Sequence, residues 1–66
     1  MTKELIGTNA GKIWSTLNEK NALTAKQLKT ATKLPDGEIY AAIGWLSRED
    51  KILAEKAGKE YKYSLI

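Results

Sequence analysis

The sequence predicts an α+β fold, in which three helices form a bundle that a C-terminal two-stranded β-hairpin closes. Three segments repeat apolar residues every three or four positions, which is typical of amphipathic helices. Two later segments alternate apolar and polar residues, which is typical of strands. We expect helices at about residues 9–20, 24–32 and 37–49, and strands at about 52–56 and 60–65. A chain of 66 residues supports a single domain over residues 1–66.

The composition excludes several classes of function. The sequence has no cysteine and no histidine, which rules out disulfides, thiolate or histidine catalysis and the usual zinc sites. Its serines and acidic residues form no recognisable pair of nucleophile and base. We therefore expect a protein that is not an enzyme and that holds no metal and no cofactor.

No targeting segment is recognisable in the sequence. The N-terminal residues lead into glycine and polar residues rather than into the apolar stretch of a signal peptide. No run approaches the roughly 20 apolar residues that a membrane span requires. We expect a cytoplasmic protein that does not enter a membrane.

The first helix is predicted from one apolar stripe. The stripe consists of Ile6, Ala10, Ile13 and Leu17. Trp14 widens the stripe and is expected in the core rather than at a contact surface. Thr8 or Asn9 is expected to cap the start, because either side chain can accept a backbone N–H bond. Asn21 is expected to end the helix, because asparagine tolerates a left-handed backbone.

The second and third helices are predicted from their start signals. Thr24 and Gln27 have the spacing of a capping box, so a helix begins there. Pro35 disfavours a helical backbone just before it, and Asp36 is a good cap, which predicts a tight turn before the third helix. The apolar stripe of that helix consists of Ile39, Ala42, Ile43 and Leu46.

The two strands can be placed in register by matching their apolar faces. Ile52 then lies opposite Tyr63, and Ala54 opposite Tyr61, because a slip of one residue would turn the tyrosines to the polar side. This register closes with a loop of two or four residues. We expect the longer loop, with Gly58 in a positive-φ conformation, since alanine before glycine suits a two-residue turn poorly.

The order of these elements resembles that of a winged helix-turn-helix domain. Segment 34–52 matches the family pattern. A hydrophobic residue, here Leu34, lies in the turn, a helix with an apolar inward face follows, and residues 49–52 lead from that helix into the wing. The clusters AGKIW at 10–14 and AIGWL at 42–46 are similar, more narrowly, to those of small stand-alone bacterial and archaeal winged-helix proteins. That group has no well-defined function.

The resemblance implies a function in DNA binding. The third helix would lie in the major groove of duplex DNA, while the second helix and the wing reach phosphates. The residues that would contact DNA are Lys26, Lys29, Tyr40, Arg48, Lys56, Lys59 and Lys62. Alternatively, the lysines are ordinary solvated side chains. A net charge of +3 is compatible with an anionic partner but does not by itself indicate one. From the resemblance, we expect a transcription-regulator-like module.

The third helix departs from the pattern of a base-reading helix. It has no Arg, Lys, Asn or Gln before Arg48, and its first half holds Asp36 and Glu38, which would repel phosphates. Tyr40 could donate a hydrogen bond to DNA, or it could be a partly buried ring at the edge of the helix. We therefore expect only weak sequence specificity.

A protein interface around Trp45, without DNA binding, is the alternative function. Trp45 lies next to Ala41 and Gly44, so a large anchor would adjoin a flat surface. Gly44 costs about 1 kcal/mol in a helix relative to alanine, which suggests that something approaches the backbone there. The partner would be a second copy in a homodimer or another protein. Trp45 could instead pack against the wing.

Overall fold

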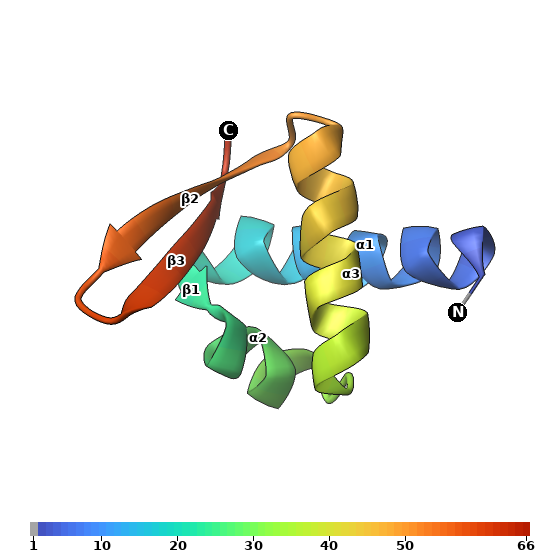
Figure 1. Ribbon diagram of the computed structural model, residues 1–66, viewed down its shortest axis with the longest axis horizontal. Coiled ribbons are helices and arrows are strands. Elements are labelled where there is room, and N and C mark those ends of the chain that lie inside the picture. Colours follow the sequence, from blue (N-terminus) through green and yellow to red (C-terminus); the bar gives the residue numbers. More distant parts are fainter. Residues whose placement is uncertain (1) are drawn as a thin grey trace.

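The computed structural model describes residues 2–66, which form three helices and three strands (Figure 1). The elements are α1 (Lys3–Lys20), β1 (Leu23–Thr24), α2 (Ala25–Thr32), α3 (Asp36–Arg48), β2 (Ile52–Ala57) and β3 (Glu60–Leu65). In Figure 1, α3 crosses α1 steeply, α2 lies beside the start of α3, and the hairpin of β2 and β3 extends to one side. The predicted α+β architecture of three helices and a C-terminal hairpin is confirmed.

The first helix begins well before its predicted start at residue 9. The cap is Thr2, whose hydroxyl accepts a hydrogen bond of 3.1 Å from a backbone amide in the first turn. The prediction of Thr8 or Asn9 as the cap is wrong, because both lie inside the helix. Gly7 does not stop the helix, since a glycine weakens it by only about 1 kcal/mol. Asn21 ends the helix as predicted, but its φ of 68° and ψ of −150° lie outside the left-handed helical region that was expected.

Asn9 links α1 to α3 from the interior of the protein. Its side chain is only 1% exposed, and its Nδ2 donates a hydrogen bond of 2.8 Å to Oε1 of Glu38. The bond satisfies a buried amide and holds the Glu38 carboxylate toward α1. An unpaired amide at this position would cost about 1–3 kcal/mol, so the bond favours one way of joining the two helices.

The start of α2 agrees with its prediction, whereas the start of α3 does not. The capping box is confirmed: Thr24 Oγ1 accepts a hydrogen bond from the Gln27 amide at 3.1 Å, and Gln27 Oε1 accepts one from the Thr24 amide at 2.9 Å. Asp36 is not the cap of α3, because Pro35 occupies that position. The Asp36 carboxylate instead pairs with Lys29 at 3.0 Å, and it still lies in the first turn, where a helix favours an anion.

The apolar core lies between the three helices and the start of β2. Its members are Ala10, Ile13, Leu17, Leu28, Leu34, Ile39, Ala42, Ile43, Leu46 and Ile52. The predicted stripe of α3 is buried in full, and that of α1 is buried from Ala10 onward. Each large side chain removed from water contributes roughly 1.5–3 kcal/mol, so this small set is the main source of stability.

The wing belongs to a three-stranded antiparallel sheet with the strand order β1-β3-β2. Leu23 of β1 lies opposite Tyr63 of β3, and Thr24 lies opposite Lys62. The sequence analysis did not predict this pairing, because a strand of two residues has no periodicity to detect. The pairing fastens the wing to the chain immediately before α2.

The register of the hairpin is shifted by two residues from its prediction. Ile52 lies opposite Leu65, and Ala54 lies opposite Tyr63, so the predicted pairings of Ile52 with Tyr63 and Ala54 with Tyr61 are wrong. The faces of the strands are nevertheless those predicted, because a shift of two residues preserves the alternation of side chains.

The turn between β2 and β3 causes this shift. Ala57 pairs with Glu60, so only Gly58 and Lys59 remain in the turn, and the predicted four-residue loop is wrong. Gly58 has a φ of +66° at the first turn position, whereas Lys59 is not among the residues with positive φ. A glycine with positive φ at the first position is the pattern of a type II′ hairpin turn, which joins two strands with only two residues.

Replacing Gly58 with alanine is expected to destabilise the protein by about 1–2 kcal/mol, because a side chain at positive φ is strained. Gly44→Ala is the matched control. Gly44 is helical, and apart from its own helix no part of the described chain lies within 4 Å of the place where its Cβ would be, so alanine should stabilise α3 by up to about 1 kcal/mol. Urea denaturation measures both effects. Equal stability of Gly58→Ala and the parent would contradict this account of the turn.

Candidate nucleic-acid interface

A groove lies where α2 begins, between α3 and the hairpin. It has a volume of about 270 Å³ and is lined by Thr24, Ala25, Lys26, Tyr40, Lys59, Glu60, Tyr61 and Tyr63. We name it the tyrosine groove. Its lining residues come from the end of β1, the start of α2, α3 and the wing, so segments far apart in the sequence contribute to one groove.

Three tyrosine rings line this groove from two elements. Tyr40 is 59% exposed and Tyr61 is 51% exposed, whereas Tyr63 is half-buried and packs against the core. Burial raises the pKa of Tyr63 above its ordinary value of 10.0, and charge repulsion from Tyr40 and Tyr61 raises it further, because neighbouring phenolates disfavour a further negative charge. The rings therefore form one cluster, with Tyr63 on its inner side and two exposed rings beside it.

Two lysines border the tyrosine groove. Lys26 lies in the first turn of α2, and Lys59 lies in the turn of the hairpin, so the ammonium groups come from separate elements. Within residues 2–66, neither lysine forms an ion pair. Glu60 is the one acidic side chain in the lining, and two lysines against one glutamate leave a net charge of +1. This charge suits an anionic ligand.

The other predicted DNA-binding residues do not line this groove. Lys29 forms the ion pair with Asp36, and Arg48 lies at the far end of α3. Lys56 lies opposite Tyr61 on the hairpin and so shares its face, whereas Lys62 is on the other face of the sheet. Of the seven predicted residues, the structure brings together in the groove Lys26, Tyr40 and Lys59.

The outward face of α3 has few groups that could read bases. After Asp36, its exposed positions are Gly37, Tyr40, Gly44, Ser47 and Arg48. The two acidic residues expected to repel phosphates both have partners in the protein. Asp36 is offset by Lys29, and Glu38 accepts its hydrogen bond from Asn9 and is held toward α1. The charge of Asp36 is thus offset by Lys29, whereas Glu38 keeps its charge because the Asn9 amide is neutral. The face is poor in base-reading side chains, as the sequence predicts.

Trp45 is half-buried and lies beside α1. A hollow of about 330 Å³ next to it is lined by Gly7, Ala10, Gly11, Trp14, Ser15, Trp45, Leu46 and Lys51. We name it the tryptophan hollow. Trp14 is 40% exposed, so the expectation of a core position is wrong: the buried stripe of α1 passes one position away from it.

The two small residues predicted beside Trp45 have different surroundings. Ala41 is half-buried and Gly44 is exposed, and neither lines the tryptophan hollow. Apart from its own helix, no part of the described chain comes within 4 Å of the position of a Cβ on Gly44. Packing inside the chain therefore does not account for a glycine at this position.

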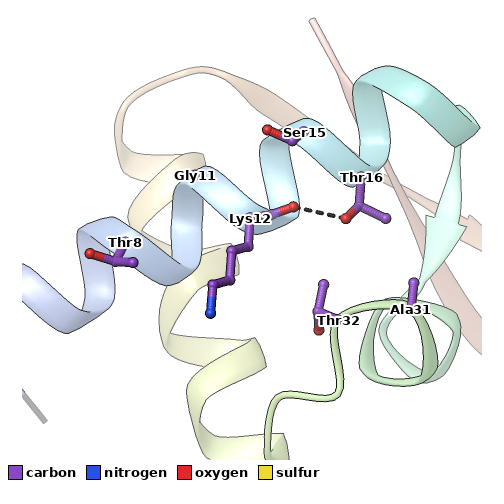
Figure 2. Close-up of a pocket in the computed structure, with 7 residues that line it drawn as sticks. All are labelled: Thr8, Gly11, Lys12, Ser15, Thr16, Ala31 and Thr32. Carbon is purple, nitrogen blue, oxygen red and sulfur yellow. Dashed lines mark hydrogen bonds between the residues drawn. The ribbon is translucent and has the colours of Figure 1, made fainter.

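A wider depression lies between α1 and the end of α2, with a volume of about 670 Å³ (Figure 2). It is lined by Thr8, Gly11, Lys12, Ser15, Thr16, Ala31 and Thr32. The Thr16 hydroxyl donates to the Lys12 carbonyl at 2.8 Å, and the Thr32 hydroxyl donates to the Leu28 carbonyl at 2.7 Å. Those donors are used within their own helices, and the lining has no aromatic ring. The tyrosine groove is the better candidate for a binding site.

Sequence reasoning missed part of the lining of the tyrosine groove. Tyr61 and Tyr63 were predicted only as strand residues that face the core, and Glu60 was given no role. A usable signal existed for Tyr61, since a ring next to a hairpin turn extends beyond a core this small. Nothing in the sequence indicated Glu60, because its place in the lining depends on how the hairpin lies against α2.

The geometry defines the class of the protein. α2, the short turn at 33–35 and α3 form a helix-turn-helix, and the hairpin after α3 is the wing. This arrangement is a winged helix-turn-helix. The chain belongs to the family described as winged helix-turn-helix domain (DUF2582), whose model matches residues 1–65. The resemblance stated from the sequence is confirmed.

A solved structure supports the same fold. The chain is similar to the solution NMR structure of protein BT2368 from Bacteroides thetaiotaomicron. The sequence identity is 32%, the match covers 98% of this chain and 79% of that chain, and the TM-score is 0.89. No curated protein matches the chain. Family and fold are thus shown, and function has to be argued from the site.

Two further observations bear on the surroundings of the site. None of the helices formed by residues 2–66 has the length and apolar character needed to cross a bilayer. Over the same residues, no three acidic side chains gather in a way that could hold a metal ion.

The raised pKa of Tyr63 predicts how stability changes in alkali. The folded chain holds this proton more tightly than the unfolded chain, so the stability is intact below about pH 10 and falls as the pH rises through the raised pKa. Tyr63→Phe should lose less stability than the parent between about pH 8 and pH 11. Urea denaturation at both pH values measures this. Tyr61→Phe is the control, and its stability should fall nearly as much as that of the parent. If the stability of Tyr63→Phe falls as much as that of the parent, the raised pKa does not belong to Tyr63.

Proposed function

We propose that this protein binds DNA with weak sequence specificity, as a transcription-regulator-like module of the cytoplasm rather than as an enzyme. The observation that supports the proposal most is the tyrosine groove, where α2, α3 and the wing together present Lys26, Tyr40 and Lys59. These three elements are the ones that winged helix-turn-helix domains place against DNA.

The mode of binding follows from the charges. Lys26 and Lys59 both line the groove and have no ion-pair partners among residues 2–66, so each is available to a phosphate. Lys56 shares the face of the hairpin with Tyr61 and adds a third cation on that side. Contacts from lysine to phosphate release counterions, which makes binding strong at low salt and weak at high salt.

Weak specificity follows from the outward face of α3. Tyr40 and Arg48 are its large exposed side chains, and they are about two turns apart, since Tyr40 lies in the second turn and Arg48 is the last residue of the helix. Base reading in the major groove normally uses several Arg, Lys, Asn or Gln side chains together. Most of the binding free energy would therefore come from the phosphate backbone, which has no sequence information of its own.

Removal of either groove lysine should weaken DNA binding and lower its dependence on salt. For Lys26→Ala and Lys59→Ala, the slope of log affinity against log salt should decrease by about 1 each, because one phosphate contact is lost. The measurement is fluorescence anisotropy with a labelled DNA duplex at about 50 mM and about 200 mM salt.

Lys12→Ala is the matched control for these variants. It removes the same charge from the depression between α1 and α2, outside the tyrosine groove, and should leave the slope almost unchanged (Figure 2). Equal effects of all three substitutions would mean that net charge alone governs binding. Failure of the parent to bind the duplex even at low salt would refute the proposal.

A second candidate function, self-association, is favoured by the tryptophan hollow. The hollow combines an exposed Trp14 ring with Gly7 and Gly11, and no neighbouring atom lies within 4 Å of a Cβ at either glycine. Each helical glycine weakens α1 by about 1 kcal/mol without serving contacts inside the chain. The Trp14 ring of one molecule could enter the hollow beside Gly7 and Gly11 of a second molecule, and the reverse.

The occupant we propose is a second copy of this chain. A two-fold interface uses one surface twice, so it needs a projection and a recess on that surface, and the tryptophan hollow has both. The adjoining hollow at Trp45 also holds Arg48 and Glu49, so charges of both signs border the face. A copy related by a two-fold rotation can place these opposite charges together.

Trp14→Ala should shift the protein toward the monomer in sedimentation equilibrium, because it removes the projecting ring. Trp45→Ala should act in the same direction, although the half-buried ring also contributes to folding, so its stability has to be checked by circular dichroism. Tyr40→Ala, which removes an exposed ring from another face, is the control and should leave the association unchanged. A parent chain that stays monomeric at every concentration would exclude the homodimer.

A further inference from the structure

The tyrosine groove has two exposed rings that the fold does not use. Tyr40 and Tyr61 both lie outside the core and are more than half exposed, whereas Tyr63 between the wing and the core is half-buried. Exposed rings from two separate elements, α3 and β3, line one small groove. Stability does not explain why both positions have aromatic side chains.

A DNA duplex offers these rings little to contact. Its bases are stacked on one another, so their faces are covered, and what reaches a protein is the phosphate backbone and the base edges. Lysines serve the backbone, and base edges require hydrogen-bonding side chains that the outward face of α3 largely lacks. The flat face of a ring becomes useful when a base is unpaired and can stack on it.

The remaining lining fits one nucleotide better than an array of phosphates. Lys26 comes from α2 and Lys59 from the turn of the hairpin, so two cations from separate elements line the groove together with the rings. Glu60 in the same lining disfavours a high density of phosphates. The volume of about 270 Å³ also limits the groove to a small part of a nucleic acid.

We propose that the tyrosine groove binds an unpaired base of single-stranded DNA, which stacks on Tyr40 and Tyr61 while Lys26 and Lys59 bind the adjoining phosphates. The inference rests on the proposed DNA binding, because the same lysines meet the backbone in both. It adds that single strands bind more tightly than duplexes and that the tyrosine rings cause the difference. Stacking accepts every base, so the preference does not depend on sequence.

The test compares two probes on the full chain. A labelled oligothymidine is titrated by fluorescence anisotropy, alone and annealed to its complement, with the parent and with Tyr40→Leu and Tyr61→Leu. The parent should bind the single strand more tightly. Each leucine variant should weaken binding of the single strand by about tenfold and that of the duplex by less than about twofold. Both rings are exposed, so both variants should fold, as circular dichroism can verify.

Tyr61→Phe is the control that separates stacking from hydrogen bonding. It keeps the ring and removes the hydroxyl, so it should bind the single strand as the parent does. Equal binding of the two probes by the parent, or equal losses for both probes in the leucine variants, would overturn the inference and leave the proposed DNA binding intact. Failure to bind either probe at low salt would overturn both. Binding of the single strand alone would support the inference and refute duplex binding.

Discussion

The crossing of α1 and α3 is the contact on which the other elements depend. Ile13 of α1 and Ile39 of α3 are almost completely buried, and Ala42, with no exposed surface, lets the two helices approach closely. Beside these apolar contacts, Asn9 donates its hydrogen bond to Glu38 across the same pair of helices. Apolar packing tolerates some sliding, whereas a buried amide has to meet its acceptor, so this bond restricts how the helices can meet.

The rest of the fold places side chains around that crossing. β1 pairs with β3 and thereby holds the wing beside the start of α2, so the strand that follows the turn runs from solvent toward the core. Along it, Tyr61 is exposed and Tyr63 is half-buried, which makes one face of the strand both a wall of the groove and a cover of the core. The tyrosine groove and the tryptophan hollow share no lining residue, so DNA and a second copy would occupy separate faces.

Most of the fold could be predicted because its signals are local. The capping box at Thr24 involves residues three apart, and the stripe of α3 repeats within one helix, so neither depends on distant contacts. The errors arose where two local signals competed. Thr8 and Asn9 have side chains that can cap a helix, but the cap is Thr2, and the burial of Asn9 against Glu38 depends on a residue 29 positions away. Gly58 could be the first or the second residue of a two-residue hairpin turn. Matching the apolar faces of the strands could not distinguish between these registers, because they differ by two residues.

The candidate site shows the same division. By itself, the sequence determined the presence and order of the three helices, the alternation of the wing strands and the shortage of base-reading residues on α3, since each follows from residue type and short spacing. The winged helix-turn-helix class came from the resemblance of this order of elements to that family. Only the tertiary structure decided which cations act together. It joined Lys26, Tyr40 and Lys59 with Tyr61 in one groove, paired Lys29 with Asp36, and left Arg48 at the far end of α3. The physical reason is that a binding surface is made by side chains from separate elements, and their meeting depends on helix crossing and strand register, which no local pattern specifies.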